Sequence, residues 1–337
     1  MNIPPLKIGN LTIDMPLILA PMAGYTDLAL RSLCRHFGCG LTFTEITNAE
    51  GIIRGQRPTL HILETAPDEH PVAAHIYGSN PDVMAKAAAE IEKLGRFHMI
   101  DINCGCPVRK IVAKGAGVAL MKSPEKIGAI VRAVKQAVSL PVTVKTRLGL
   151  SPNRMNISEV AQSVEEAGGD AIFIHVRFAT AKHGGDAAWN ILAKIKSERT
   201  IPVVGNGGIT VPEDVPKMFS ETGVDGVMIG RAAIGHPWIF REVSCLLTEQ
   251  PLPRLSLVER RAVVAEHLAE FVKLKEIERK WKRKSARVTS EELAVRHFTG
   301  HLIAYLRGCK NQGEWKRNLQ SLHTIEDVLM VVDKVLE

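Results

Sequence analysis

The sequence predicts an α/β protein, a (β/α)8 TIM barrel followed by a small all-helical bundle, and three observations support this fold class. Apolar runs of strand length recur eight times between residues 17 and 233. Each run ends in a glycine or polar cluster and precedes a segment with helical spacing. After residue 240 the strand pattern stops and only helical spacing remains.

Residues 6–13 predict a hairpin, because two short apolar runs flank the turn residues Gly9 and Asn10. The eight longer runs are apolar on both faces, as expected of strands buried between a core and surrounding helices. They cover residues 17–24, 41–47, 72–78, 99–107, 142–149, 171–177, 202–209 and 226–233. Eight evenly spaced units indicate a closed barrel. A doubly wound open sheet is the alternative, which the lack of Gly-x-Gly-x-x-Gly after the first strand disfavours.

The segments between the runs carry helical signals. Asn80-Pro81 and Ser123-Pro124 each offer an N-cap followed by proline at the first helical position. Residues 158–168 predict a further helix that ends at two glycines. We expect a barrel domain over 1–245, a proline-containing linker over 246–254, and a helical domain over 255–337.

Composition places the chain among globular proteins, with 45% hydrophobic and 23% charged residues. No signal-peptide pattern and no apolar run of membrane-spanning length is found, so we expect a cytoplasmic protein that does not insert into membranes. Six cysteines without the spacing of a disulfide scaffold agree with a reducing compartment.

The net charge of +7 is concentrated in one segment. Residues 273–287 hold eight basic and two acidic residues, a net charge of +6, and include Lys282, Arg283 and Lys284. Such a concentration favours an anionic partner such as RNA, although a solvated helix face is the alternative interpretation.

Barrel enzymes place catalytic groups at the C-terminal ends of their strands. Lys145 stands inside an apolar run, where it is tolerated only if a polar or anionic group receives it. The glycines and the arginine after the last two runs lie where such barrels bind phosphate, and tight strand–helix turns are the alternative. The candidate residues at the strand ends are Pro21, Met22, Ala23, His75, Asn103, Cys106, Lys145, Arg147, His175, Arg177, Asn206, Gly207, Gly208, Gly230 and Arg231.

Cys106 lies between Gly105 and Pro107, on a backbone with few alternative conformations, so the direction of its thiol is fixed. It is therefore the first candidate for a reactive acid or nucleophile, with a small buried hydrophobe as the alternative. Cys104 and Cys106 are also compatible with half a metal site. No partner pair with zinc-like spacing occurs elsewhere, so we expect no metal.

Seven motifs in order resemble the tRNA-dihydrouridine synthases, and among them the bacterial B-type enzymes. The resemblance covers the whole chain, because members of this family have an FMN-binding barrel followed by a helical RNA-binding domain. Residues 295–308 (VRHFTGHLIAYLRG) are similar to that second domain. The motifs are APMAGYTD (20–27), INCGCP (102–107), GAGVALM (115–121), VKTRLG (144–149), IHVR (174–177), GNGGI (205–209) and GRAAIGHPWIF (230–240).

The resemblance implies a reaction in which NADPH reduces FMN, flavin N5 delivers hydride to C6 of a uracil in tRNA, and Cys106 protonates C5. A thiol with a pKa of about 8.5 would stay protonated until it is needed. Asn103, Arg147 and Arg177 would contact the uracil or nearby RNA, and no obligate protein partner is implied. The residues implied in FMN binding are Pro21, Met22, Ala23, His75, Lys145 and His175 along the flavin, and Asn206, Gly207, Gly208, Gly230 and Arg231 at its phosphate.

The sequence departs from the family pattern at three positions. His75 stands where the family usually has a glutamine that contacts the flavin pyrimidine, Phe178 replaces a threonine, and Gly208 replaces an acidic residue. The departures at His75 and Phe178 suggest, as one alternative, an RNA-binding protein without redox activity. Two further alternatives stay open: a barrel oxidoreductase of a small pyrimidine, and a Schiff-base aldolase that uses Lys145.

Overall fold

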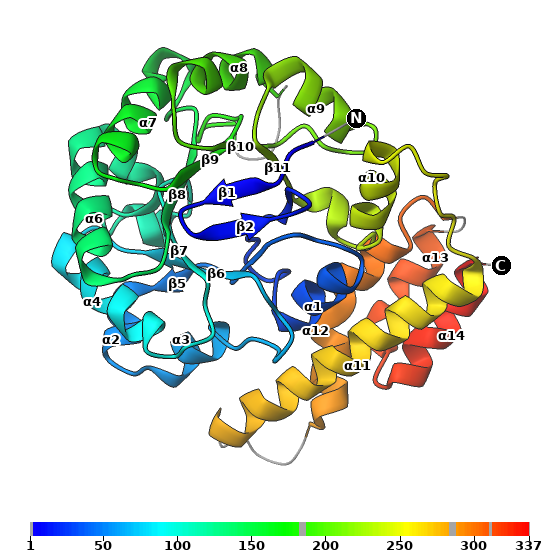
Figure 1. Cartoon of the computed structure of the whole chain (residues 1–337). Helices are drawn as coiled ribbons and strands as arrows, with labels where there is room; N and C mark the ends of the chain where they lie inside the picture. The colour runs from blue at the N-terminus through cyan, green and yellow to red at the C-terminus, as the bar shows by residue number, and fades with distance from the viewer. Residues whose placement is uncertain (1–2, 182–186, 283–287, 310–311, 337) are drawn as a thin grey trace.

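The computed structural model describes residues 3–181, 187–282, 288–309 and 312–336. Arg283 and Lys284 lie outside the described residues, and so does the side chain of Lys282. The part of the chain that is described forms a barrel of parallel strands ringed by helices, with further helices packed at one side (Figure 1).

All eight predicted runs form strands of one parallel sheet, in the order β3-β11-β10-β9-β8-β7-β6-β4, with β5 beside β6. A parallel bridge between Ile18 and Leu41 joins the first strand to the last, so the barrel closes and the open-sheet alternative is excluded. The run at 41–47 yields two short strands rather than one. The strands are β3 (Leu17–Leu19), β4 (Thr42–Phe43), β5 (Thr47–Asn48), β6 (Val72–Tyr77), β7 (Met99–Asn103), β8 (Val142–Arg147), β9 (Ala171–His175), β10 (Val203–Asn206) and β11 (Gly226–Ile229).

Helices surround the barrel as the spacing predicts (Figure 1). The Asn80 side chain caps α4 by accepting from the Val83 N–H at 3.1 Å. The cap expected from Ser123 is wrong, because its hydroxyl bonds the Glu125 carboxylate instead of a helix N–H. The α-helices are α1 (Leu28–His36), α2 (Ala49–Ile53), α3 (Arg57–Ile62), α4 (Pro81–Glu92), α5 (Arg109–Val112), α6 (Pro124–Ala137), α7 (Ile157–Glu166), α8 (Trp189–Glu198), α9 (Asp214–Thr222) and α10 (Ile239–Leu247). The 3-10 helices in this part are η1 (Gly117–Lys122), η2 (Pro152–Arg154) and η3 (Arg231–Ala233).

The predicted hairpin is present, with β1 (Leu6–Ile8) and β2 (Leu11–Ile13) paired antiparallel. It lies over one end of the barrel in Figure 1. Its buried residues Leu6 and Ile8 belong to the same apolar cluster as Phe43 and Phe173 from the barrel interior. This cluster fills the barrel at the N-terminal ends of the strands, opposite the end that carries the candidate residues.

In the described chain after α10, every element of regular secondary structure is a helix. These helices are α11 (Leu257–Lys282), α12 (Ser290–Tyr305), α13 (Gln312–Arg317), η4 (Leu319–Ser321) and α14 (Ile325–Leu336). Their buried residues, among them Leu268, Phe298 and Leu302, share an apolar cluster with Ala29 of α1. The segment predicted as a linker begins inside α10, and the division into two domains stays a prediction. Of the helices described, none combines the length and apolar character needed to cross a membrane.

Candidate active site

A cavity of about 450 Å³ opens where the barrel strands end, within the range of roughly 300–1,000 Å³ that small-molecule sites occupy. All of the candidate site residues given above at the strand ends line it, whereas Gly24 and Glu45 at the same rim line a different cavity. Tyr25, which also lines the first of these cavities, was missed although it stands in the motif 20–27, and the apolar Ile46 and Val108 gave no signal. The predicted residues brought together here are Pro21, Met22, Ala23, His75, Asn103, Cys106, Lys145, Arg147, His175, Arg177, Asn206, Gly207, Gly208, Gly230 and Arg231.

Strand register brings these residues to one level of the barrel. Asn103 on β7 pairs with Lys145 on β8, and Arg147 pairs with His175 on β9. His175 pairs in turn with Asn206 on β10. Because parallel strands end at the same rim, residues more than 100 positions apart in sequence converge on one cavity.

Lys145 is held at the cavity by an amide. Its Nζ donates to Asn206 Oδ1 at 3.2 Å, while Asn206 Nδ2 donates to the Met228 carbonyl at 2.7 Å. Burial, and then the neighbouring charge of Arg147, lowers the pKa of Lys145 to about 8. Burial disfavours the ammonium charge of Lys145 in the free protein. An anionic group bound beside it would therefore stabilise that charge.

Arg147 is 4% exposed and bonds backbone carbonyls on both sides. Its Nε donates to Gly105 O at 2.9 Å and its Nη1 to Phe178 O at 3.2 Å, so it links the loops that follow β7 and β9. Burial lowers its pKa to about 10. Arg177 Nη1 lies 3.3 Å from His175 Nε2. These bonds fix the loops from which Cys106 and Arg177 extend.

The two cysteines of the motif differ in environment. The Cys106 N–H donates to Asn103 Oδ1 at 3.0 Å, and the Cys106 carbonyl accepts from Val118 N at 3.0 Å. Cys106 is half-buried and lines the cavity, and burial raises the pKa of its thiol. Cys104 is fully buried in the core between barrel and helices, and burial raises its pKa as well. Only Cys106 can reach a ligand in the cavity.

Glycine is required at two positions after β10. Gly207 has φ +107°, and a Cβ there would lie 2.9 Å from His175 Cδ2. Gly208 has φ +85°, and its Cβ would lie 2.8 Å from Trp189 Nε1. Both glycines are therefore needed for the tight turn after β10, which was the alternative interpretation of these residues. After β11 the chain passes through Gly230 into η3, whose first residue is Arg231. The ends of β10 and β11 thus bring together glycines, the start of the short helix η3 and the positive charge of Arg231. This combination fits a bound phosphate group.

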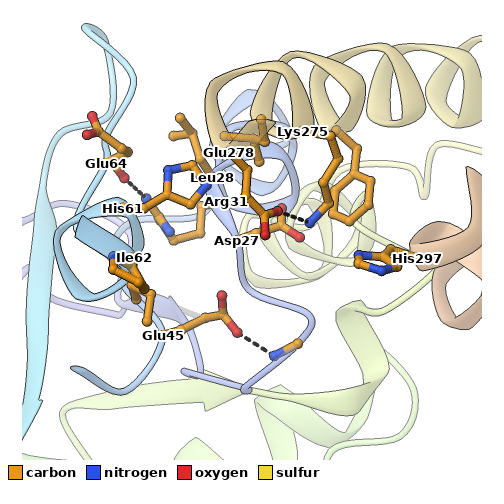
Figure 2. Close-up of a pocket in the computed structure, with 14 residues that line it drawn as sticks. Asp27, Leu28, Arg31, Glu45, His61, Ile62, Glu64, Lys275, Glu278 and His297 are labelled. Atoms are coloured by element: carbon orange, nitrogen blue, oxygen red, sulfur yellow. Dashed lines mark hydrogen bonds and ion pairs between the residues drawn. The ribbon is translucent and has the colours of Figure 1, made fainter. Parts of the chain in front are cut away.

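A second cavity, of about 540 Å³, lies between the loops at the barrel rim and α11 (Figure 2). Sequence reasoning predicted no site there. Burial raises the pKa of Asp27 to about 7 and also raises that of Glu45, whose carboxylate accepts from the Gly24 N–H. Lys275 faces them from α11, and its Nζ lies 3.1 Å from Glu278 Oε2. Gly24 lines this cavity and the next residue, Tyr25, lines the first, so one loop borders both.

Metal ligation finds no support in the part of the chain that the structure describes. No group of three or more His, Cys, Asp or Glu side chains there is arranged to hold a metal ion.

Solved structures with the same fold support the barrel assignment. Histamine dehydrogenase from Rhizobium sp. 4-9 superposes with a TM-score of 0.57 at 15% identity, covering 79% of this chain and 50% of that one. A 2-naphthoyl-CoA reductase superposes with a TM-score of 0.55 at 12% identity, covering 73% of this chain and 52% of that one. At these identities the likeness concerns the fold alone.

Sequence relatives are closer. tRNA-dihydrouridine synthase B of Pseudomonas aeruginosa is 40% identical over 267 residues, which is 79% of this chain and 80% of that protein. A probable tRNA-dihydrouridine synthase of Mycobacterium tuberculosis is 33% identical over 98% of this chain and 85% of its own length. These matches confirm the predicted family and the likeness to B-type enzymes. Since the family model described as dihydrouridine synthase (Dus) matches residues 18–337, the chain belongs to the dihydrouridine synthase family of enzymes.

Proposed function

We propose that this protein reduces the C5–C6 double bond of uridines in tRNA to 5,6-dihydrouridine, with FMN as cofactor and NADPH as reductant. One observation carries the proposal beyond family membership. A glycine-lined turn that fits a phosphate, a half-buried lysine and a half-buried thiol line the same cavity at the barrel mouth. Each has a role in this chemistry, and the names of the relatives support the tRNA substrate.

The residues present fit FMN. Gly207, Gly208, Gly230 and Arg231, with Asn206 beside them, would hold its phosphate, and the backbone of Pro21, Met22 and Ala23 would lie along its ring. Bound FMN would supply hydride transfer from NADPH to C6 of the uracil. Lys145, with His175 near it, would offset the negative charge that collects on a reduced flavin.

Cys106 would donate the proton to C5. Burial raises the pKa of its thiol, so it stays protonated at neutral pH, as a general acid requires. Asn103 would orient the uracil: one hydrogen of its Nδ2 points to His75, and the other can be donated to a uracil carbonyl. Arg177 and Arg147 would contact the base or the neighbouring RNA backbone.

The helical region would bind the tRNA. A uridine in folded RNA must be extruded to reach the barrel mouth, and contacts elsewhere must supply that energy. The basic run at 273–287, with Lys282, Arg283 and Lys284, is suited to phosphate contacts. We therefore propose a catalytic domain over 1–245 and an RNA-binding domain over 255–337. A tRNA substrate and six free cysteines favour the cytoplasm.

The test is reconstitution with purified protein, FMN, NADPH and unmodified tRNA, read by nucleoside mass spectrometry. The protein should purify with a flavin spectrum. Dihydrouridine should form only when the flavin-loaded protein, NADPH and tRNA are all present, and protein stripped of flavin should regain activity when FMN is added. Binding of tRNA without any flavin would instead indicate an RNA-binding homologue. Turnover of free uracil or dihydroorotate without RNA would indicate the small-pyrimidine oxidoreductase, and a flavin spectrum would exclude the aldolase.

A further inference from the structure

A chain of buried hydrogen bonds runs from the barrel interior to the Cys106 turn. His75 on β6 is 2% exposed, and its Nδ1 lies 2.6 Å from Asp101 Oδ2 on β7. The other Asp101 oxygen accepts from Thr143 Oγ1 at 2.6 Å. On the far side of the ring, Asn103 Nδ2 lies 2.8 Å from His75 Nε2.

The direction of each bond follows from the backbone. Asn103 Oδ1 accepts the N–H groups of Gly105 at 3.3 Å and Cys106 at 3.0 Å, and a backbone N–H can only donate. The amide orientation of Asn103 is thereby fixed, and its Nδ2 must donate to His75 Nε2. Nε2 then carries a lone pair, so the proton of a neutral His75 is on Nδ1, where it is donated to Asp101.

Both ring nitrogens of His75 are thus used inside the protein. Phe43 meets the ring edge to face, with 6.1 Å between centroids, and leaves it little freedom to turn. A flavin in the cavity could touch the ring but would find neither a donor nor an acceptor on it. The glutamine that the family usually has at this position would offer both.

We propose that His75 is a positioning residue rather than a hydrogen-bonding partner of the flavin. Oriented by Asp101, it holds the Asn103 amide, and Asn103 holds the Gly105–Cys106 turn that presents the thiol. The proposal deepens the proposed function and rests on it only for the role of Cys106 in catalysis. The arrangement of the chain is independent of that role.

His75→Leu removes both bonds, and Ile102→Val is a matched control, since Ile102 is fully buried on β7 but outside the hydrogen-bonded chain. We expect the dissociation constant for FMN of the His75→Leu variant to stay within about threefold of the wild-type value, since the flavin loses no hydrogen bond in this variant. Dihydrouridine formation should fall about tenfold or more. The rate of Cys106 alkylation by iodoacetamide, followed by peptide mass spectrometry, should change about threefold or more.

A loss of FMN affinity of about tenfold or more in His75→Leu would overturn the proposal, because a direct flavin bond would explain it. An unchanged alkylation rate would also overturn it. If wild-type protein forms no dihydrouridine, the proposed function fails, while FMN affinity and alkylation still test His75.

A second measurement does not depend on the folding of His75→Leu, because it uses only the wild type and His75→Gln. In protein with ¹⁵N-labelled histidine, the wild-type signal that is absent from His75→Gln belongs to His75. We expect it to show a proton on Nδ1 and none on Nε2 at neutral pH. A proton on Nε2 would contradict the proposed chain and overturn the inference.

Discussion

The ring of Tyr25, which lines the cavity at the barrel mouth, meets the ring of His301 on α12 edge to face, with 5.3 Å between centroids. Gly300 makes this approach possible, since a Cβ there would lie 3.2 Å from the Tyr25 hydroxyl. A wall of the candidate active site is therefore packed directly against the helical region. Changes in that region can reach the site through this contact.

His301→Leu should make the protein less sensitive to acid. His301 is 1% exposed, and neither of its ring nitrogens has a hydrogen-bond partner among the residues that the structure describes. Burial lowers its pKa to about 4, below its value in the unfolded chain. As pH falls from 6.5 to 4, His301 therefore gains a proton in the unfolded state but not in the folded state. This lowers the unfolding free energy of the wild type by on the order of 3 kcal/mol, and the variant, which lacks this histidine, avoids that loss.

Urea unfolding of both proteins at several pH values between 4 and 7 measures this effect. The variant should gain relative stability as pH falls. His267 has its Nδ1 3.0 Å from the Tyr305 hydroxyl and a depressed pKa of its own, so part of the acid sensitivity will persist. A stability difference that does not vary with pH would show that His301 titrates normally.

Asp27→Asn should stabilise the protein progressively as pH rises from about 4 to about 7. Burial raises the folded-state pKa of Asp27 to about 7, so the wild type loses stability as pH rises from the unfolded value through the folded one. Asparagine keeps the oxygen that accepts from the Leu30 N–H at 3.1 Å and caps α1. The measurement is the difference in unfolding free energy between the two proteins across that range. Asp68→Asn, at an exposed position, is the control, and an equal pH dependence in both variants would contradict the prediction.

Most of the fold follows from patterns visible in the sequence. Strands buried on both faces read as largely apolar runs, and each of the eight was found although single polar residues such as His75, Asp101 and Lys145 stand within three of them. The break between β4 and β5 was missed, since the residues between them, Thr44 to Ile46, carry no signal in the sequence that the strand is interrupted. The Ser123 cap failed because a nearby carboxylate competes for the hydroxyl, an interaction that spacing alone does not reveal.

The candidate site was predictable to the extent that one rule covers it: residues at the ends of parallel strands meet. This rule does not predict which side chains bond to one another. The bond between His75 and Asp101 depends on the register of β6 and β7, which places the two residues opposite each other. The Tyr25–His301 contact and the second cavity depend on how α11 and α12 pack against α1, which single-sequence patterns do not encode.

Lys145→Met should weaken FMN binding most below pH 8. The pKa of Lys145 is about 8 in the free protein, so its ammonium group is present below that pH and is lost as pH rises through it. Wild-type affinity for FMN should therefore fall between pH 7 and pH 9, whereas affinity of the variant should change little. Quenching of flavin fluorescence measures both. Parallel pH profiles for the two proteins would show that Lys145 does not bear on the flavin.

Cys106→Ala should leave FMN binding and NADPH oxidation intact while dihydrouridine formation falls by roughly 100-fold or more, the scale of a missing general acid. Cys104→Ala is the matched control, since it deletes a thiol that packs in the core. It should lower stability, by about 1 kcal/mol for a small cavity, without stopping the reaction. Single-turnover assays with reduced enzyme separate the two. Full activity of Cys106→Ala would refute the proton-donor role.

Neutralising Lys282, Arg283 and Lys284 by glutamine should weaken tRNA binding and flatten its dependence on salt. Each phosphate that the protein no longer neutralises lowers the slope of log affinity against log salt by somewhat less than one unit, so the slope of the triple variant should fall by about two. A control removes the same charge at exposed positions on the hairpin, α8 and α9, through Lys7, Lys194 and Lys217. Filter binding at several salt concentrations gives both slopes. Equal slopes in the two triple variants would mean that the run is a solvated face and that tRNA binds elsewhere.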